Sequence, residues 1–161
     1  MSDIYEVLAE LGIPFQKHEH PPVFTVEEAD DHTGDLPGAR TKNLFLRNKK
    51  GDRHYLVTLE SRKPVDLKAL RKLLGESSLS FASPERLREH LGLTPGAVSP
   101  FGIVNDRERK VVVVIDGELW REELLNYHPN DNRATLTLSR ADFQRFLEHC
   151  GNEVRILELP A

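Results

Sequence analysis

Residues 40–61 read RTKNLFLRNKKGDRHYLVTLES, and this stretch decides the fold class. Residues 40–48 and 54–61 are rich in β-branched, aromatic and other apolar side chains, a composition that favours β-strands. The KKGD sequence between them predicts a turn, because Gly51 can adopt a positive φ without a steric cost. The stretch therefore predicts a β-hairpin.

Helices and further strands are predicted on both sides of this hairpin. Helix starts are indicated by capping residues that precede apolar side chains at helical spacing, at Asp3, Thr25, Asp66, Ser83 and Ser139. Strands are expected at 13–20, 110–115, 134–138 and 154–159, and loops at 30–38 and 94–102. This irregular order predicts an α+β fold with a mixed sheet, as a single domain spanning residues 1–161.

Composition limits the class of protein. The chain has 161 residues, of which 39% are hydrophobic and 30% charged, enough for one packed core. The single cysteine, Cys150, excludes an internal disulfide framework and a CxxC site. No apolar run approaches the length of a membrane span, and residues 1–11 are acidic, unlike a signal peptide. We therefore expect a soluble cytoplasmic domain with no membrane partner.

The charges are segregated along the chain. Residues 40–72 hold eleven Lys and Arg against three acids, a balance of +8 in a chain whose net charge is -4. The first 39 residues have one basic side chain and nine acids. A basic field on an acidic body fits a partner with a phosphate backbone, such as RNA. An ordinary solvated hairpin and helix would also explain it.

The first candidate site is the sequence Thr41-Lys42-Asn43. In an extended strand, Lys42 shares a face with Leu44 and Leu46, whereas Asn43 shares the other face with Phe45. A lysine on an apolar face is unusual, because an ammonium group leaves water only when it is paired. Lys42 either lines a pocket that takes an anionic ligand or extends along the surface to solvent.

Two loops are further candidates. The segment Gly96-Ala97-Val98-Ser99-Pro100 has a GxxxP spacing, and a stiff loop with free backbone N–H groups can stabilise an oxyanion. It could equally be a plain turn. The segment 127–132, YHPNDN, is polar, and His128 could orient water or bind a ribose hydroxyl. Its Asn and Asp side chains could equally bond their own backbone.

Metal and nucleophile sites are weakly indicated. His18 and His20 would share a strand face and could form half of a zinc site, but no third and fourth ligands stand at familiar spacing. His149 and Cys150 are adjacent on a helix and diverge, which argues against a Cys/His pair. We expect no metal and no cofactor.

Taken in order, these motifs resemble one family. The strings TKNLFLRNKKG, YLVTL, LSFASPERL, LTPGAVSPFGIVND and YHPNDNRATLTLSRADF are similar to the YbaK/ProX family of aminoacyl-tRNA deacylases, related to the editing domain of bacterial prolyl-tRNA synthetases. The resemblance covers nearly the whole chain and is strongest to the branch that clears alanine from proline tRNA. It implies a partial barrel flanked by helices.

The resemblance also implies roles for individual residues. The essential lysine of the family corresponds to Lys42, with Asn43 beside it, and the GxxxP loop to Gly96 through Pro100, so that Lys42, Gly96 and Pro100 are the expected catalytic positions. The family holds water through loop backbone and the substrate's ribose hydroxyl. We expect the Lys42 ammonium to face the loop across a small cavity. The expected substrate-binding residues are Thr41, Asn43, Phe45, Val57, Ala97, Val98, Ser99, His128 and Asn132.

The predicted reaction is hydrolysis of Ala-tRNA(Pro) by water, with the proline tRNA acceptor end as partner and prolyl-tRNA synthetase as a second possible partner. A smaller pocket that admits alanine and rejects proline would act as a second sieve. Three alternatives stay open: a deacylase for Cys-tRNA(Pro), an inactive tRNA- or synthetase-binding module, and a metallohydrolase that uses His18 and His20.

Overall fold

β2 (Ala39–Asn48) is the centre of the sheet in the computed structural model of the protein, which describes residues 3–23, 25, 27–28 and 36–160. It forms the predicted hairpin with β3 (His54–Glu60). On its other edge it pairs in parallel with β6 (Leu124–Tyr127) and antiparallel with β4 (Leu79–Phe81). Gly51 has a φ of 73° at the hairpin turn, as predicted.

The sheet is mixed and open. Its eight strands run in the order β1-β7-β6-β2-β3-β5-β8, with β4 beside β2. The remaining strands are β1 (Gln16–Glu19), β5 (Val111–Asp116), β7 (Ala134–Ser139) and β8 (Val154–Leu157). The pairs β2/β6, β3/β5 and β5/β8 are parallel and the others antiparallel. The predicted α+β fold with a mixed sheet is confirmed, and the sheet does not close into a barrel.

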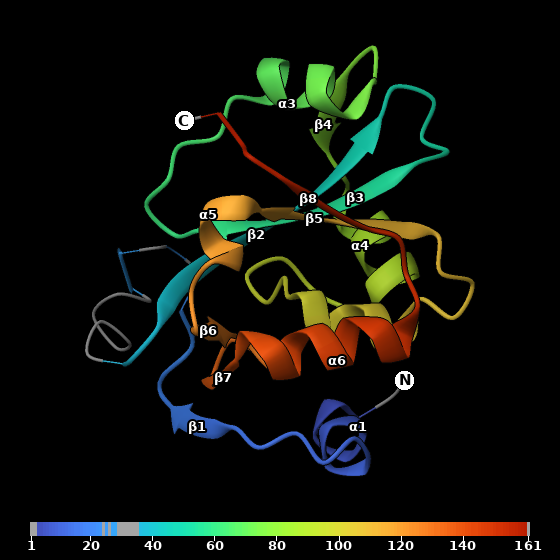
Figure 1. The fold of residues 1–161 in the computed structure, drawn as a ribbon. Helices are drawn as coiled ribbons and strands as arrows, with labels where there is room; N and C mark the ends of the chain where they lie inside the picture. The colour runs from blue at the N-terminus through green and yellow to red at the C-terminus, as the bar shows by residue number, and fades with distance from the viewer. Residues whose placement is uncertain (1–2, 24, 26, 29–35, 161) are drawn as a thin grey trace.

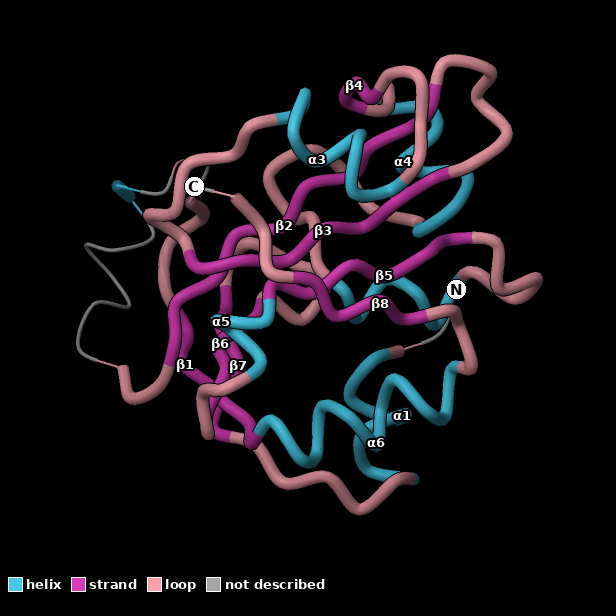
Figure 2. Tube along the Cα trace, turned by 45° about the horizontal axis from the view of Figure 1, so that its top comes forward, coloured by secondary structure: helices cyan, strands magenta, loops and turns pink. Residues whose placement is uncertain are grey.

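Helices cover the two faces of the sheet unequally. One face carries α1 (Ile4–Glu10), α4 (Pro84–Leu91), the short 3₁₀ helix η1 (Pro100–Asn105) and α6 (Arg140–Cys150). The other carries α3 (Leu67–Leu74), and Figures 1 and 2 show α3 and α6 on opposite sides of the strands. A short helix, α5 (Gly117–Trp120), follows β5.

Two apolar clusters follow from this arrangement. The first cluster lies under α1, α4 and α6 and includes Phe45, Phe101, Tyr127 and Phe143. The second cluster lies under α3 and includes Leu46, Val57, Leu59 and Leu70. Because side chains alternate along a strand, neighbouring residues of β2 enter different clusters.

The predicted helix caps are confirmed. Asp3, Asp66, Ser83 and Ser139 each accept a backbone N–H from the first turn of the helix that follows. Thr25 Oγ1 accepts the N–H of Glu28 at 3.1 Å, whereas Ala29 and most of the expected loop 30–38 lie outside the described residues.

Several predicted boundaries were wrong. The strand expected at 13–20 spans only Gln16–Glu19, because the Ile13 N–H bonds to Leu8 O at the end of α1 and Pro14 has no N–H to donate. The loop expected at 94–102 becomes η1 from Pro100 onward. The last strand ends at Leu157 rather than 159. Sequence reasoning also missed β4, α5 and β6, each of which has three or four residues.

Candidate functional site: an opening in the sheet beside β2

The edge of β2 is left open between two of its neighbours. β6 pairs with it only at Ala39 and Arg40, and β4 only from Leu46 onward. The Thr41 hydroxyl donates to Asn126 O at 2.6 Å, at the point where β6 diverges. In the described part of the chain no strand pairs with this edge at residues 42–44. The sequence Thr41-Lys42-Asn43 therefore lies beside a gap in the sheet.

Lys42 and Asn43 point to opposite faces at this gap, as the strand alternation predicts. Lys42 is half-buried and stands opposite Leu59 of the second cluster. Asn43 stands opposite Thr58, whose hydroxyl is 3.0 Å from the hydroxyl of Tyr127 in the first cluster. Asn43 Oδ1 is buried and has no hydrogen-bond partner among the described residues. A buried amide with an unused acceptor is costly unless a ligand or water completes it.

Phe45 and Val57 occupy different faces as well. Phe45 belongs to the first cluster and Val57 to the second. Our expectation that the strands around both residues line one amino-acid pocket is therefore at odds with the alternation of the strands. Of the two, only Phe45 shares the face of Asn43.

The GxxxP loop is a stiff turn with two unused backbone donors. Gly96 has a φ of 90°, which favours glycine, and the Ala97 N–H donates to Thr94 O at 3.1 Å. Ser99 is fully buried, and its hydroxyl accepts the Phe101 N–H at 3.2 Å, so it caps η1. Among the residues that the structure describes, the N–H groups of Val98 and Ser99 meet no acceptor. Two successive free amides can bind an oxyanion.

The loop lies on the face of Asn43. Val98 packs against the first cluster, which contains Phe101 just beyond Pro100. Alternation along β2 gives this side to the Asn43 side chain and the opposite side to the first atoms of the Lys42 side chain. Our expectation that the Lys42 ammonium faces the loop across a small cavity stays a prediction.

His128 lies just past the end of β6 (Leu124–Tyr127), two residues after Asn126, the last residue of β6 that pairs with β2. Its Nδ1 is 2.9 Å from Ala134 O, so this nitrogen carries the proton and Nε2 is the acceptor. Desolvation lowers the pKa of the His128 ring below its usual value, which keeps the ring neutral at pH 7.

The segment 18–23 is fixed to the loop that follows β6. Asn132 Nδ2 donates to Val23 O at 3.0 Å, and the His20 N–H donates to Arg133 O at 3.0 Å. The contacts of Asn132 thus organise the loop. His20 uses both ring nitrogens, Nδ1 toward Pro21 O at 2.9 Å and Nε2 toward the Thr135 hydroxyl at 3.0 Å. A zinc ion on His20 would have to break one of these bonds.

Sequence reasoning missed Thr58 and Asn126, and it considered Tyr127 only as part of the polar segment 127–132. Thr58, Asn126 and Tyr127 are buried, and each bonds another residue at the gap. Asn126 also donates through Nδ2 to Pro37 O at 2.9 Å, which ties the chain before β2 to β6. The buried Asn and Tyr of an apolar stretch are the only sequence signal that could have found them.

Comparison with known proteins assigns the chain to a family. The sequence model of the aminoacyl-tRNA editing domain matches residues 20–146, which include β2, the GxxxP loop and the His128 loop. The chain belongs to the aminoacyl-tRNA editing domain family. The family resemblance found in the sequence is thereby confirmed.

Individual relatives of this editing domain span nearly its whole length. The prolyl-tRNA editing protein ProX of Acetoanaerobium sticklandii is 43% identical over 94% of this chain and 93% of its own. A prolyl-tRNA synthetase associated domain-containing protein of Danio rerio is 40% identical over 96% of this chain and 85% of its own. A crystal structure described as a proposed trans-editing enzyme for prolyl-tRNA synthetase has the same fold, with a TM-score of 0.69 at 23% identity, covering 97% of this chain and 96% of that chain.

Membrane spans and metal clusters are both missing from the described residues of the editing domain. None of its described helices has both the length and the apolarity needed to cross a bilayer. Within the same residues, no group of three or more His, Cys, Asp and Glu side chains is placed to hold a metal ion.

Proposed function

We propose that this editing domain is a trans-editing hydrolase that deacylates mischarged proline tRNA, with alanine as the amino acid removed. Family membership and the name of the 43% identical relative support the class of substrate. The observation that carries the reaction is the gap beside β2. There an amide with an unused acceptor, Asn43, shares a face with the free N–H groups of Val98 and Ser99.

The reaction does not require a nucleophilic side chain. An aminoacyl ester is already activated, so a positioned water and a stabilised oxyanion suffice. Water attacks the ester carbonyl carbon, and the carbonyl oxygen gains negative charge opposite the Val98 and Ser99 N–H groups. The bond from carbon to the ribose oxygen then breaks, the ribose takes a proton, and alanine leaves as its carboxylate.

His128 and Lys42 have separate tasks in this proposal. His128 Nε2 accepts a hydrogen bond from the 2′- or 3′-hydroxyl of the terminal adenosine, because Nδ1 is already committed to Ala134 O. Lys42 offers a positive charge to the terminal phosphate from the other face of β2, with no part in stabilising the oxyanion. Both groups hold the 3′ end while the loop acts on the ester.

Specificity follows from size. A synthetase pocket built for proline gains only about 1–3 kcal/mol against a smaller side chain, which is too little to exclude alanine. A second pocket that is too small for proline excludes it by steric clash. Phe45 is the buried neighbour of Asn43 on the same face and is our candidate for the wall of that pocket.

A deacylation panel tests the proposal. Purified protein is mixed with proline tRNA charged with alanine, cysteine, serine or proline, and amino acid release is followed with EDTA present. We expect alanine to be released fastest and proline to be spared, and Lys42→Ala to lose the activity. Faster release of cysteine would assign the cysteine branch. Binding of tRNA without any release would leave an inactive binding module.

A further inference from the structure

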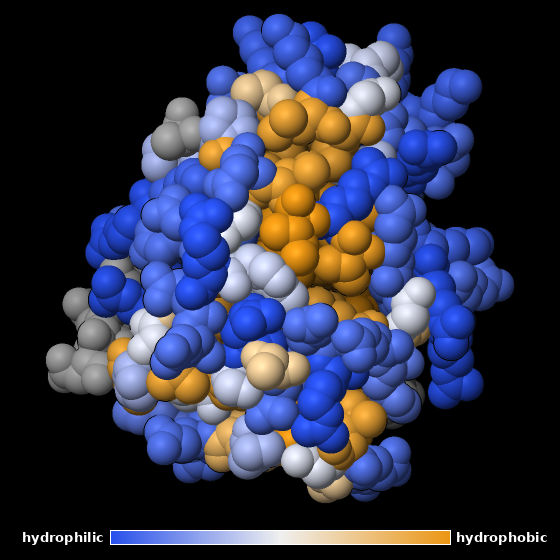
Figure 3. Space-filling model, in the orientation of Figure 1, coloured by the Kyte–Doolittle hydropathy of each residue, from blue (hydrophilic) through white to orange (hydrophobic). Residues whose placement is uncertain are grey.

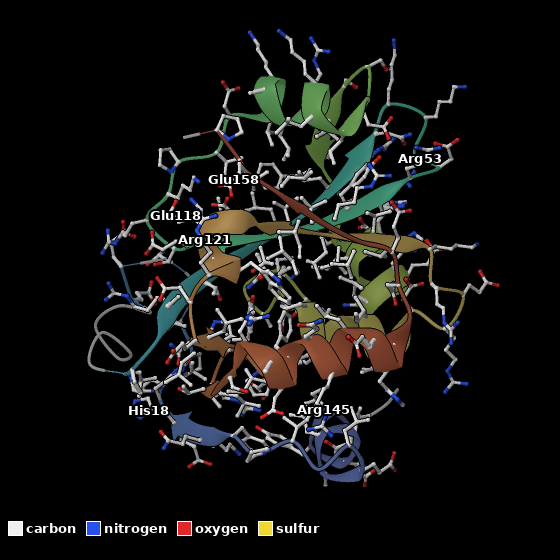
Figure 4. All side chains as sticks on the ribbon, in the orientation of Figure 1. His18, Arg53, Glu118, Arg121, Arg145 and Glu158 are labelled. Atoms are coloured by element: carbon white, nitrogen blue, oxygen red, sulfur yellow. The ribbon has the colours of Figure 1, made fainter. Side chains whose placement is uncertain are left out.

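We propose that the tip of the β2–β3 hairpin, together with α3 and Phe81 of β4, is a docking surface for the phosphate backbone of an RNA duplex. This inference rests on the proposed function, in which RNA carries the substrate. The proposed surface is remote from the ester and holds the body of the RNA. The hairpin tip is residues 49–53, and Figure 4 shows its Arg53 at the end of the hairpin.

Arg53 on the hairpin tip pairs with Glu76 at 4.0 Å, but four lysines of this surface form no ion pair in the described part of the chain. Lys49 and Lys50 on the tip and Lys68 and Lys72 on α3 are exposed, and within the described residues none of them forms an ion pair. Several cations elsewhere are neutralised locally, as shown by Lys110–Glu108 at 2.7 Å, Arg121–Glu158 at 2.6 Å and Arg145–Asp142 at 3.0 Å. A cluster of exposed cations without ion pairs is a place where an external polyanion gains binding energy.

The hairpin tip is held rigid before any partner arrives. Asn48 is buried, and its Oδ1 accepts the N–H groups of Gly51, Asp52 and Arg53 at 2.9, 3.1 and 3.2 Å. Because the backbone that carries Lys49 and Lys50 is already ordered, a ligand does not have to order it.

Two arginines fix the carbonyl side of the tip. Arg47 donates to Lys49 O at 3.0 Å, and Arg86 of α4 donates to Gly51 O at 3.1 Å. A Cβ at Gly51 would lie 2.8 Å from Arg86 Nη2 and 2.9 Å from Arg47 Nη2, so a side chain there would push these two guanidinium groups aside. These arginines position the tip, and the lysines are left to face the partner.

An exposed aromatic side chain joins the two basic elements. Phe81 is 61% exposed although it pairs directly with the buried Leu46. Its strand, β4, contacts α3 and pairs with the end of β2, so Phe81 lies between the basic helix and the basic hairpin. An exposed ring among cations is suited to stack on a ribose or an unpaired base.

A hollow separates the hairpin tip from the end of α3. Its volume is about 320 Å³, and Lys49, Lys50, Arg53, Gly75 and Ser77 line it. Asp52 and Glu76 also line it; Asp52 accepts from Asn48 Nδ2 at 2.7 Å, and Glu76 is bonded to the Tyr55 hydroxyl and lies 4.0 Å from Arg53. A backbone phosphate is therefore expected at the Lys49 and Lys50 side of the hollow, away from these two carboxylates.

The distance between this surface and the gap beside β2 indicates that the surface contacts the RNA away from its 3′ end. Lys49 is seven residues beyond Lys42 along β2, and at about 3.3 Å per residue the offset is about 23 Å. A group this far from the gap cannot touch the ester, but it can contact the stem that carries the 3′ end. Figure 3 also shows an apolar strip on the face of the molecule below α3, which is a separate feature.

The test compares two pairs of neutralising substitutions. Lys49→Gln/Lys50→Gln changes the tip, and Arg121→Gln/Arg140→Gln removes the same charge near α5 and α6 as a control. Binding of uncharged proline tRNA is measured by fluorescence anisotropy over a salt series. We expect the tip variant to bind more weakly and to lower the slope of log K against log salt by about two, one for each phosphate that it no longer neutralises. The control should keep the wild-type slope.

Deacylation then separates this inference from the proposed function. We expect the tip variant to lose kcat/KM on full-length Ala-tRNA(Pro) but to keep the wild-type rate on an alanylated CCA trinucleotide. If the wild type releases no alanine from either substrate, the proposed function fails whatever the binding data show. If the wild type is active and the tip variant has the wild-type slope and kcat/KM, the docking surface is refuted. The docking surface would also be refuted if the tip variant lost binding to phosphatidylserine vesicles while it kept the tRNA binding of the wild type.

Discussion

His54 makes the stability of this fold sensitive to acid. The ring is 4% exposed, stacks on Phe45 with centroids 5.4 Å apart, and lies 4.1 Å from the ring of His90. Its Nε2 is 3.1 Å from Arg86 Nη1 and must accept, because a guanidinium has no acceptor. Burial, followed by the charges of His90, Arg86 and Arg47, lowers the pKa of His54 from 6.5 to about 4.

The sign and size of the effect follow from linkage. Between pH 6.5 and about 4 the unfolded chain binds a proton at this residue and the folded chain does not, so the free energy of unfolding falls as the pH falls. Each pH unit changes the free energy of unfolding by about 1.36 kcal/mol, so acidification across this whole pH range lowers it by roughly 3 kcal/mol. Protonation would also turn Nε2 into a donor facing Arg86, which holds Gly51 O at the hairpin tip.

Urea unfolding at pH values from 7.5 to 4 measures the effect. We expect His54→Phe, which keeps a ring beside Phe45, to lose much of the pH slope that the wild type shows between 6.5 and 4. His149→Gln on the exposed side of α6 should keep that slope. NMR titration of the wild-type imidazoles provides a reading that does not depend on a variant folding. A His54 that titrates near 6.5, or equal slopes in wild type and His54→Phe, would refute the reasoning.

Three further predictions concern the site and the core. Gly96→Ala forces a side chain onto a φ of 90°, so we expect it to cost about 1 kcal/mol or more in urea unfolding and to lower kcat more than it raises KM; an unchanged kcat would show that the loop tolerates the strain. The rate of deacylation should fall at acid pH as His128 becomes protonated, with the midpoint below 6.5 because its pKa is lowered, and a pH profile of His128→Gln should lack that limb. Burial raises the pKa of the Cys150 thiol to about 12, so iodoacetamide at pH 8 should modify it only after unfolding, and rapid modification of the native protein would contradict its burial.

The sequence predicted the elements whose signals are local. The hairpin, the four helix caps at Asp3, Asp66, Ser83 and Ser139, and the buried valine strand all depend on residues within one or two turns of one another. β4 and β6 were missed because three or four residues carry no periodicity, and their pairing with β2 is a long-range event.

The site shows the same division. Alternation along β2 correctly separates Lys42 from Asn43, since the period of two is a local property. The packing of α4 and η1 on the sheet decides which of these two residues shares a side with the GxxxP loop. No local sequence pattern predicts that packing. The gap itself arises because β6 leaves β2 after Arg40, which no motif signals.

The central claim is that the gap beside β2 is an esterase site in which Asn43 and the loop amides act together. Single-turnover hydrolysis of Ala-tRNA(Pro), with wild type and Asn43→Ala compared in EDTA at saturating protein, tests it most directly. We predict rapid release of alanine by the wild type and a loss of about tenfold or more in Asn43→Ala, because the variant lacks the buried amide acceptor that holds the substrate or the attacking water beside the loop amides. A wild type no faster than buffer, or an Asn43→Ala variant with the full wild-type rate, would contradict the account.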